Sequence, residues 1–527
     1  MGRRWPPRRP ARSAVDAAPQ PQPLGRARHP LPPSTRNQRR KNRRHAMKPA
    51  NFLYILSDQH HRMASGAYGH PLVQTPHLDA LAARGTRFQN AYTNCPICVP
   101  ARASLATGRY VHQIGCWDNG HPYDGSVPSW HQRLREQGFV CDSIGKLHFK
   151  GQGTDHGFTD EVEPLHVVDG SGDVLGCIRD DPPFRDKEGE LGRAGPGDST
   201  YLQYDARCAE HALRWLADHK DDDKPWAVFL NFVCPHPPYI APPEIYSQYP
   251  VEDVPLPPQW TPETWPQHPA MDYFRRFFRF DQGFDEETVR RVTAAYYGTT
   301  TYLDQQIGQV LSALDQHELT DSTRVLYSSD HGECLGARGL FGKFTLYDEA
   351  AAVPMIAAGP DVPVGKVIQT PVSLVDSFPT ALACLGAEQV DEDLPGRSLW
   401  QIAQEDDQQR TVFSEYHALG TERGTYMLRN GRYKCNYYVG KNPQLFDLQE
   451  DPDELHDLSE EAKYGSMLRD FEVELRGLLD PEAVDEQARA SQRAMVKAAG
   501  GREVVIQRGA FDHSPTPGEK AAFRAHG

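Results

Sequence analysis

A run of residues that begins at Cys98 carries the most distinctive chemistry in this 527-residue chain. Cys98 is followed by Pro100 and Arg102, and residues 98–108 read C-x-P-x-R-x-x-L-x-T-G. Cys95 and Cys98 also form a C-x-x-C pair, which is typical of redox motifs and of half a zinc site. The chain has no second such pair to complete a four-cysteine site, and zinc would not explain Pro100 or Arg102. A buried structural cysteine is a further alternative, but six defined residues in eleven favour a functional motif over a chance match.

Two acidic residues, Asp58 and Asp330, each follow an apolar run that is typical of a buried strand. Either one alone could simply cap the turn or helix that comes after it. Because both stand at strand ends, with Cys98 between them in the sequence, we interpret them as ligands of a hard divalent cation. Gln59 offers a carbonyl oxygen beside the first, and His331 offers a ring nitrogen beside the second. Calcium suits an all-oxygen site, whereas His331 would favour manganese.

The run at Cys98 resembles the signature of the type I sulfatases, which belong to the alkaline phosphatase superfamily. In that family the cysteine is oxidised after translation to formylglycine, so the resemblance implies a maturation enzyme as a partner. The hydrated aldehyde is a geminal diol. One of its oxygens attacks sulfur, and the other expels sulfate as the aldehyde reforms, which neither a thiol nor a plain hydroxyl could do. Ala101 stands where many members have Ser, and either small residue should allow conversion.

The pairs beside the two acidic residues refine this resemblance. Many arylsulfatases have Asp-Asp and Asp-Asn at these places, whereas this chain has Asp58-Gln59 and Asp330-His331. The pairs look more like the choline sulfatase and phosphonate monoester hydrolase branch. The resemblance implies that these four residues and the formylglycine at Cys98 hold one divalent cation.

The resemblance covers roughly residues 48–460 and assigns roles to five more side chains. Arg102 would anchor the formylglycine, and Lys146 and Lys343 would bind the sulfate. His148, in a G-K-x-H segment, would contact the diol or the ester. His236, between two prolines, would donate a proton to the leaving-group oxygen. Positive charge that is fixed inside a site stabilises an anion strongly, as an acidic enzyme acting on an anionic ester requires.

The elements that position these residues are predicted from short apolar runs and helical periodicity. Strands are expected over 51–57, 227–233 and 324–329, and ligand sites in α/β sheets gather at the carboxyl ends of such strands. Helices are expected from Pro76 and over 292–314, and Cys98 is expected in a loop before a helix that begins near Ala101 or Arg102. The alternation predicts an α/β fold, with a large, mostly parallel sheet between helix layers, as a catalytic domain over 48–405.

The pattern changes after residue 405. Short β-like runs at 411–416, 425–428, 433–438 and 444–447 are separated by turns, including one at Asn430-Gly431. They predict a small antiparallel sheet in a C-terminal subdomain over 406–490, with a helix at 472–479. Residues 491–527 are polar and weakly patterned, so we expect an extension or the arm of a homo-oligomer.

The charge is unevenly distributed. Residues 1–47 hold twelve Arg and one Lys against Asp16, although the whole chain has a net charge of −14. This tail is also rich in proline, so we predict that it is disordered; translation from Met47 would omit it. A basic tail can bind nucleic acid. The strongly acidic remainder argues against nucleic acid as a partner of the core.

Composition limits the remaining alternatives. The chain is 39% hydrophobic and has no apolar run near the ~18 residues that a membrane span needs. Its ten cysteines are scattered, and no export signal is visible, so we expect reduced thiols and a cytoplasmic location. The predicted activity is hydrolysis of small anionic sulfate monoesters. Hydrolysis of phosphonate monoesters or phosphodiesters at the same site is the alternative. The leaving group would contact the loops at 164–193 and 250–284.

Overall fold

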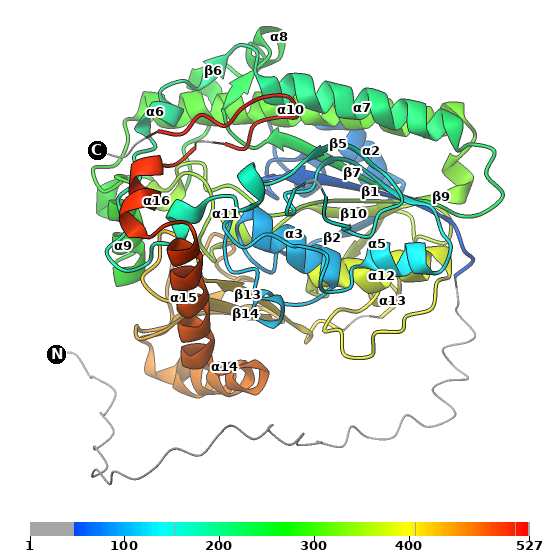
Figure 1. Cartoon of the computed structure of the whole chain (residues 1–527). Coiled ribbons are helices and arrows are strands. Elements are labelled where there is room, and N and C mark those ends of the chain that lie inside the picture. Colours follow the sequence, from blue (N-terminus) through cyan, green and yellow to red (C-terminus); the bar gives the residue numbers. More distant parts are fainter. Residues whose placement is uncertain (1–46, 152, 406, 512, 525–527) are drawn as a thin grey trace. The chain divides into compact units, whose positions relative to one another are not determined.

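A buried strand, β1 (Asn51–Asp58), lies near the middle of an eight-stranded sheet (Figure 1). Its side chains alternate between two apolar cores: Tyr54 and Leu56 pack on one face of the sheet, and Leu53 and Ile55 on the other. A strand that is covered on both faces reads as a continuous apolar run, which explains why this strand was predictable from the sequence.

The computed structural model describes residues 47–151, 153–405, 407–511 and 513–524. Apart from Met47, the predicted disordered tail over 1–47 lies outside these residues. Within the described part of the chain, no helix is both long and apolar enough to cross a membrane.

The large sheet is mixed but mostly parallel. Its order is β11 (Lys366–Ile368), β2 (Gly85–Phe88), β10 (Met355–Ala358), β9 (Thr323–Ser329), β1, β7 (Ala227–Pro235), β4 (Cys141–Lys146) and β5 (Glu161–Leu165). Strand β10 is antiparallel to both of its neighbours, and the other pairs are parallel. The parallel block β9-β1-β7-β4 is the part that carries the predicted site residues.

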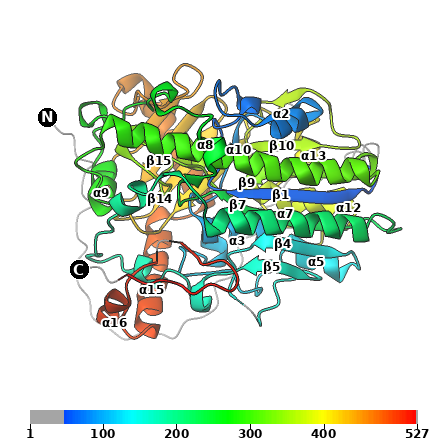
Figure 2. The same ribbon diagram turned by 90° about the horizontal axis from the view of Figure 1, so that it is seen from above.

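Helices cover both faces of this sheet. On one face lie α2 (Pro76–Ala83), α7 (Thr200–Asp218) and α10 (Glu286–Gln316), and on the other lie α3 (Cys98–Thr107), α5 (Trp130–Glu136) and α12 (Ser377–Leu385). Figure 2 shows α7 and α10 side by side along the strands. The predicted α/β fold, with a sheet between helix layers, is therefore confirmed.

The helix that carries the signature starts earlier than the sequence predicted. Helix α3 begins at Cys98 itself, directly after the extended residue Ile97, and not near Ala101 or Arg102. Pro100 is tolerated because backbone N–H groups in the first turn have no partner within the helix. The Val99 N–H donates to the Asn119 side-chain oxygen at 3.1 Å instead. Cys98 is thus held by a helix and not by a loop.

The C-terminal part contains the predicted antiparallel sheet, with β13 (Thr411–Tyr416), β14 (Thr425–Asn430), β15 (Tyr433–Tyr438) and β16 (Gln444–Asp447) in that order. Three helices follow: α14 (Gly465–Leu478), α15 (Pro481–Ala498) and α16 (Arg502–Arg508). The last two were not predicted. The Asp480 side chain caps α15 by accepting from the Ala483 N–H, and Pro481 occupies its first position.

Smaller elements complete the fold. They are the strand pairs β3 (Ala91–Tyr92) with β12 (Val372–Ser373) and β6 (Gly195–Pro196) with β8 (Ile240–Ala241), and the helices α4 (Val111–Ile114), α6 (Glu188–Leu191), α8 (Pro243–Tyr246), α9 (Pro269–Phe277), α11 (Asp348–Ala351) and α13 (Leu399–Ile402).

Candidate active site

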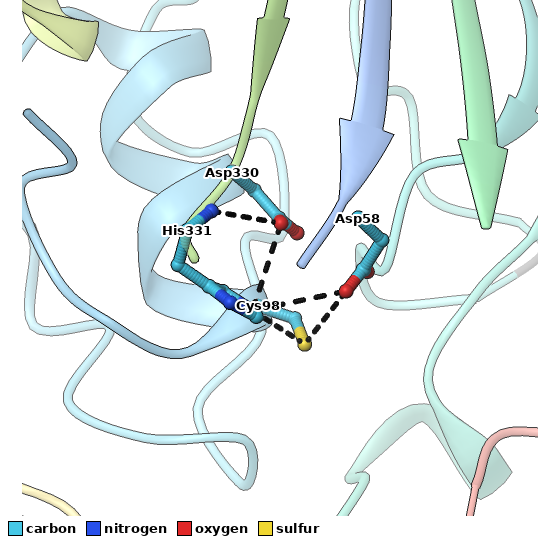
Figure 3. Close-up of side chains that lie close together, drawn as sticks. All are labelled: Asp58, Cys98, Asp330 and His331. Carbon is cyan, nitrogen blue, oxygen red and sulfur yellow. Dashed lines mark hydrogen bonds and ion pairs between the residues drawn. The ribbon is translucent and has the colours of Figure 1, made fainter. Parts of the chain in front are cut away.

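Four adjacent parallel strands deliver polar side chains to one edge of the sheet. Asp58 is the last residue of β1, and Asp330 directly follows the neighbouring strand β9. Lys146 ends β4, and His236 directly follows β7. Because the carboxyl ends of parallel strands meet at one edge, residues far apart in the sequence come together there. The N-terminus of α3 adds Cys98 to the same place (Figure 3).

Asp58, Cys98, Asp330 and His331 form a buried cluster in which one donor atom from each lies within 4.8 Å of the others. His331 Nε2 lies 3.2 Å from Cys98 Sγ, 3.7 Å from Asp58 Oδ1 and 3.6 Å from Asp330 Oδ1. The other ring nitrogen, Nδ1, donates to the Gly332 carbonyl at 3.1 Å. This contact leaves the Nε2 lone pair facing the carboxylates, as in metal sites where a backbone carbonyl orients the histidine. The donor set therefore fits a divalent cation.

Arg102 orients both carboxylates. Its Nε donates to Asp330 Oδ2 at 2.8 Å and its Nη2 to Asp58 Oδ2 at 3.4 Å. Lys146 Nζ lies 2.6 Å from the same Asp58 oxygen. Arg102 Nη1 donates to the Lys146 carbonyl and to Asn231 Oδ1 at 3.3 Å, which fixes the guanidinium in place. The Oδ1 atoms of both aspartates remain turned toward the cluster, so Arg102 holds the site together in addition to the anchoring role that the resemblance implies.

The two carboxylates differ in the direction of their pKa shifts. Burial raises the pKa of Asp58, but the positive charges of Lys146, Lys343 and Arg102 outweigh it and hold that pKa well below its usual value. Burial and the negative charge of Asp58 raise the pKa of Asp330. Two buried carboxylates this close repel each other. A cation between them would favour the ionised form of both.

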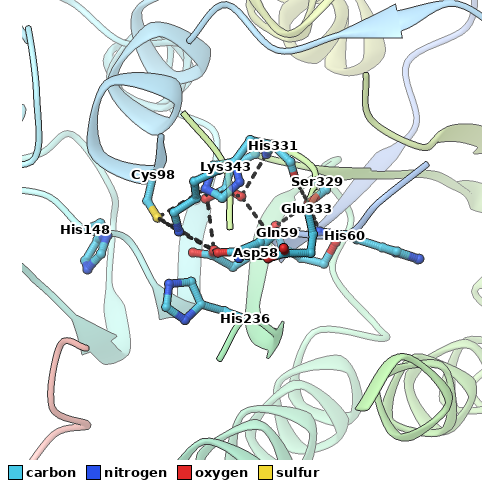
Figure 4. Close-up of polar contacts among 12 residues, drawn as sticks. Asp58, Gln59, His60, Cys98, His148, His236, Ser329, His331, Glu333 and Lys343 are labelled. Carbon is cyan, nitrogen blue, oxygen red and sulfur yellow. Dashed lines mark hydrogen bonds and ion pairs between the residues drawn. The ribbon is translucent and has the colours of Figure 1, made fainter. Parts of the chain in front are cut away.

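Gln59 and Lys343 lie beside this cluster (Figure 4). Gln59 has a left-handed backbone with φ of 67°, which is uncommon for a residue other than glycine and is often found at functional sites. Its Oε1 accepts from Lys343 Nζ at 2.6 Å, and the same Nζ lies 3.0 Å from Cys98 Sγ. The amide oxygen of Gln59 therefore faces the site.

Glu333 is a buried residue that the sequence analysis did not assign. Its Oε2 accepts from Gln59 Nε2 and, at 3.0 Å, from the Tyr239 hydroxyl. Its Oε1 accepts from the backbone N–H groups of Leu335 at 3.1 Å and Gly342 at 2.5 Å. Glu333 therefore fixes the orientation of the Gln59 amide and the loop that precedes Lys343. Its place two residues after His331 was the only signal in the sequence.

His148 and His236 lie near the Cys98 side chain, and burial lowers the pKa of both well below the usual value (Figure 4). Lys146 adds to this effect at His148, and Lys343 at His236. His236 Nδ1 donates to the Pro237 carbonyl at 2.7 Å, so the lone pair of the neutral ring is on Nε2. His148 Nε2 contacts Ser514 Oγ at 2.8 Å, and its buried Nδ1 has no hydrogen-bond partner among the described residues.

These side chains surround a cavity of about 140 Å³. Six of the predicted site residues line its wall: Gln59, Cys98, Lys146, His148, His236 and Lys343. Asp58, Arg102, Asp330 and His331 do not line it and lie fully or almost fully buried. From the predicted loops, residues of the 164–193 stretch such as Asp173 and Arg185 line the wall, whereas the 250–284 stretch contributes none among the described residues.

The redox and zinc interpretations of the Cys95–Cys98 pair find no support in the structure. Cys95 and Cys98 are both free, like the other eight cysteines. The metal-type cluster around Cys98 contains two aspartates and a histidine but not Cys95. Burial raises the pKa of the Cys95 thiol well above its usual value. Cys95 is therefore an inert core residue, and the pair is neither a disulfide nor half of a four-cysteine site.

Known proteins share this architecture. The family described as Sulfatase matches residues 50–387, and the family described as N-sulphoglucosamine sulphohydrolase, C-terminal, matches residues 336–480. The chain is 32% identical to the choline-sulfatase of Rhizobium meliloti (strain 1021), over 90% of this chain and 95% of that protein. It is 28% identical to arylsulfatase K of Bos taurus, over 82% of each chain. Among solved structures, the phosphonate monoester hydrolase of Agrobacterium radiobacter has a TM-score of 0.66 at 23% identity, with 83% of this chain and 96% of that chain covered, which shows the fold.

Proposed function

This chain belongs to the sulfatase family and is a sulfuric ester hydrolase, and from this premise we propose that its nucleophile is a formylglycine made from Cys98. It would cleave sulfate monoesters into an alcohol and inorganic sulfate, after a maturation enzyme has oxidised the thiol. One observation carries the proposal. Cys98 Sγ lies 3.2 Å from His331 Nε2 and 3.0 Å from Lys343 Nζ, between the cation donors and a sulfate-binding amine.

One divalent cation would be held by Asp58, Gln59, Asp330 and His331 together with the oxidised side chain at Cys98. Calcium is the ion we expect because carboxylate and amide oxygens dominate this donor set, and the nitrogen of His331 also suits manganese. When bound, the cation would stabilise negative charge on the ester and on the nucleophile.

The side chains would move three protons during the reaction. In the first step, one diol oxygen passes its proton to the Asp58 carboxylate, whose Oδ1 lies 3.7 Å from Cys98 Sγ, and bonds to sulfur. The bond between sulfur and the leaving oxygen breaks, and His236 protonates that oxygen. In the second step, His148 takes the proton of the remaining hydroxyl, the carbon–oxygen bond to sulfate breaks, and the aldehyde reforms as sulfate leaves. Water then restores the diol. Lys146 and Lys343 would hold the sulfate oxygens throughout.

The geometry of the two histidines supports these roles. His236 can donate from Nε2 only as an imidazolium because its Nδ1 proton is already donated to the Pro237 carbonyl. Lys343 and Lys146 oppose that protonation in the free protein, and the negative charge of a bound sulfate would offset them. His148 is held neutral by burial and by Lys146, which leaves it ready to accept a proton.

Hydrolysis of p-nitrophenyl sulfate tests the proposal. Cys98→Ala should reduce kcat to background, whereas Cys95→Ala removes a similarly buried thiol three residues earlier and should keep activity. Equal rates for Cys98→Ala and wild type would contradict the mechanism. Sulfur and phosphorus oxyanions have similar shapes, so the site residues alone do not separate the two ester classes. Faster hydrolysis of the matched p-nitrophenyl phosphonate ester would favour the phosphonate alternative.

Some predictions rest on the sequence alone. A cytoplasmic location is one, although it agrees with ten free cysteines. Three others are the domain boundaries at residues 405 and 490, the formation of a homo-oligomer, and the prediction that the acidic core does not bind nucleic acid. The 140 Å³ cavity is smaller than the roughly 300–1,000 Å³ of sites for drug-sized ligands, which supports a small anionic ester as substrate.

A further inference from the structure

The C-terminal segment from Ala510 to Arg524 forms one wall of the cavity in front of Cys98. Its lining residues are Ala510, Phe511, His513, Ser514 and Arg524. In Figure 2 this red segment leaves α16 and runs back toward α7. The two family matches end at residues 387 and 480, so the segment lies beyond both. This wall is therefore a feature of the chain's own C-terminal part and not of the matched regions.

Several contacts hold the segment in place. The Ala510 and Arg524 backbones exchange two hydrogen bonds, of 3.1 and 2.7 Å, which close the segment into a loop. The Tyr201 hydroxyl, on α7, donates to the Ser514 carbonyl at 2.7 Å. The Tyr201 ring also packs edge-on against His513, with ring centroids 5.2 Å apart. Satisfied backbone groups and ring packing fix the position of Ser514 against the cavity.

Ser514 meets His148 at this position. Its Oγ lies 2.8 Å from His148 Nε2, and both side chains are buried, with exposed fractions of 7% and 5%. His148 has φ of 56°, in the left-handed region, so its backbone is held in an uncommon conformation. If Nε2 carries the ring proton and donates it to Ser514 Oγ, the ring lone pair is on Nδ1, and His148 is one of the residues that line the cavity. Nδ1 is the nitrogen that has no other partner among the described residues.

We propose that Ser514 is a positioning residue that fixes the Nε2–H tautomer of His148 and so presents Nδ1 as the base, which makes the C-terminal segment part of the active site. This inference rests on the proposed function, because the proton that Nδ1 accepts is that of the second diol hydroxyl. A serine that only filled space would not affect the tautomer. The expected effects are therefore on the chemical step and on the ring, and not on substrate binding.

Ser491 supplies a matched control. It lies on α15, also in the C-terminal part, and its Oγ contacts His121 Nε2 at 3.0 Å. Neither residue lines the cavity around Cys98. Ser491→Ala thus removes the same kind of serine–histidine contact from the same region without touching the proposed site.

The test combines NMR spectra with kinetics on the full-length protein. With ¹⁵N-labelled histidine, the His148 signals are those that His148→Asn removes. Wild type and Ser514→Thr should show the Nε2–H tautomer, and Ser514→Ala should show a mixture. General base catalysis is worth about 10²–10⁴ in rate, so kcat of Ser514→Ala on p-nitrophenyl sulfate should fall at least about tenfold with KM unchanged. Ser514→Thr should recover most of kcat, and Ser491→Ala should match wild type.

The outcomes separate the two claims. An unchanged tautomer in Ser514→Ala would overturn the inference, whatever the activity of the protein. A wild-type protein without sulfate ester hydrolysis would refute the proposed function, and the NMR comparison would still decide whether Ser514 positions His148. A double mutant gives a further test. If His148→Asn lowers kcat by the same factor in Ser514→Ala as in wild type, the two effects are additive and the inference is overturned, because a residue that acts through another gives non-additive effects.

Discussion

Replacing Glu333 by glutamine should weaken binding of the cation although Glu333 is not one of its proposed ligands. A glutamine can keep the two bonds from the Leu335 and Gly342 N–H groups on its carbonyl oxygen. Its NH₂ group then occupies the place of Oε2. The Tyr239 hydroxyl can rotate to accept from it, but the NH₂ of Gln59 cannot.

The donor–donor conflict is resolved if the Gln59 amide turns over. That rotation would direct the Gln59 NH₂ group at Lys343 Nζ and at the cation, in place of the oxygen that now accepts from Lys343 at 2.6 Å. A buried polar group left without its partner costs about 1–3 kcal/mol. This agrees with the 10- to 100-fold losses of metal affinity that accompany removal of residues behind a ligand. We therefore expect the apparent Kd for Ca²⁺ to rise about 10- to 100-fold in Glu333→Gln.

The assay is a Ca²⁺ titration of activity after exhaustive chelation, supported by calorimetry. Glu415→Gln serves as the matched control, because Glu415 is fully buried and hydrogen-bonded to His112 and His417. It should leave the Ca²⁺ titration unchanged. Wild-type Ca²⁺ affinity in Glu333→Gln would refute the argument that Glu333 orients Gln59 as a ligand.

Three further changes have defined outcomes. Lys343→Met removes a charged donor that lies 3.0 Å from Cys98 Sγ. Because hydrogen bonds to charged groups are worth about 1.5–3 kcal/mol, kcat/KM should fall about 10- to 100-fold. A loss of less than about threefold would argue against a contact between Lys343 and sulfate. Arg102→Met leaves the buried carboxylates of Asp58 and Asp330 without their guanidinium, so it should lower the free energy of unfolding by about 3–5 kcal/mol. Urea unfolding in the presence of a chelator measures this, and a free energy of unfolding equal to that of wild type would contradict it. Burial opposes ionisation of Glu415, but His112 and His417 outweigh it and lower its pKa to about 2. A depressed carboxyl pKa stabilises the fold above the unfolded value of about 4.5 and loses that contribution as the pH falls toward 2. Wild type should therefore lose about 3 kcal/mol more than Glu415→Gln over that range, and parallel pH profiles of the two proteins would contradict the sign.

The parts of the site that were predictable share a local signal. Asp58 ends a buried apolar strand, and His236 and Asp330 each directly follow one, so the apolar run and its polar end are visible in the sequence. Strand order then does the rest, because β9, β1 and β7 are parallel neighbours. The position of Cys98 was less predictable. The helix was expected to begin near Ala101 or Arg102, whereas it begins at Cys98 and accommodates Pro100 in its first turn.

The residues that were missed depend on contacts between distant parts of the chain. Ser514 and His148 are 366 residues apart, and no periodicity relates them. Helix α15 was hidden because its inward face includes polar residues such as Asp485 and Gln492. Gln492 is buried because it donates to Asp118 and to the His417 carbonyl. A polar residue that is buried through hydrogen bonds looks like a surface residue in a sequence pattern.

The most direct measurement is the mass of the tryptic peptide of residues 88–102, isolated from active protein produced in its native host. Formylglycine is lighter than cysteine because an oxygen replaces the sulfur and two hydrogens are lost. The proposed mechanism predicts this loss at Cys98, in proportion to the catalytically active fraction, and an intact thiol at Cys95 in the same peptide. Fully active protein with an unmodified Cys98 would contradict it.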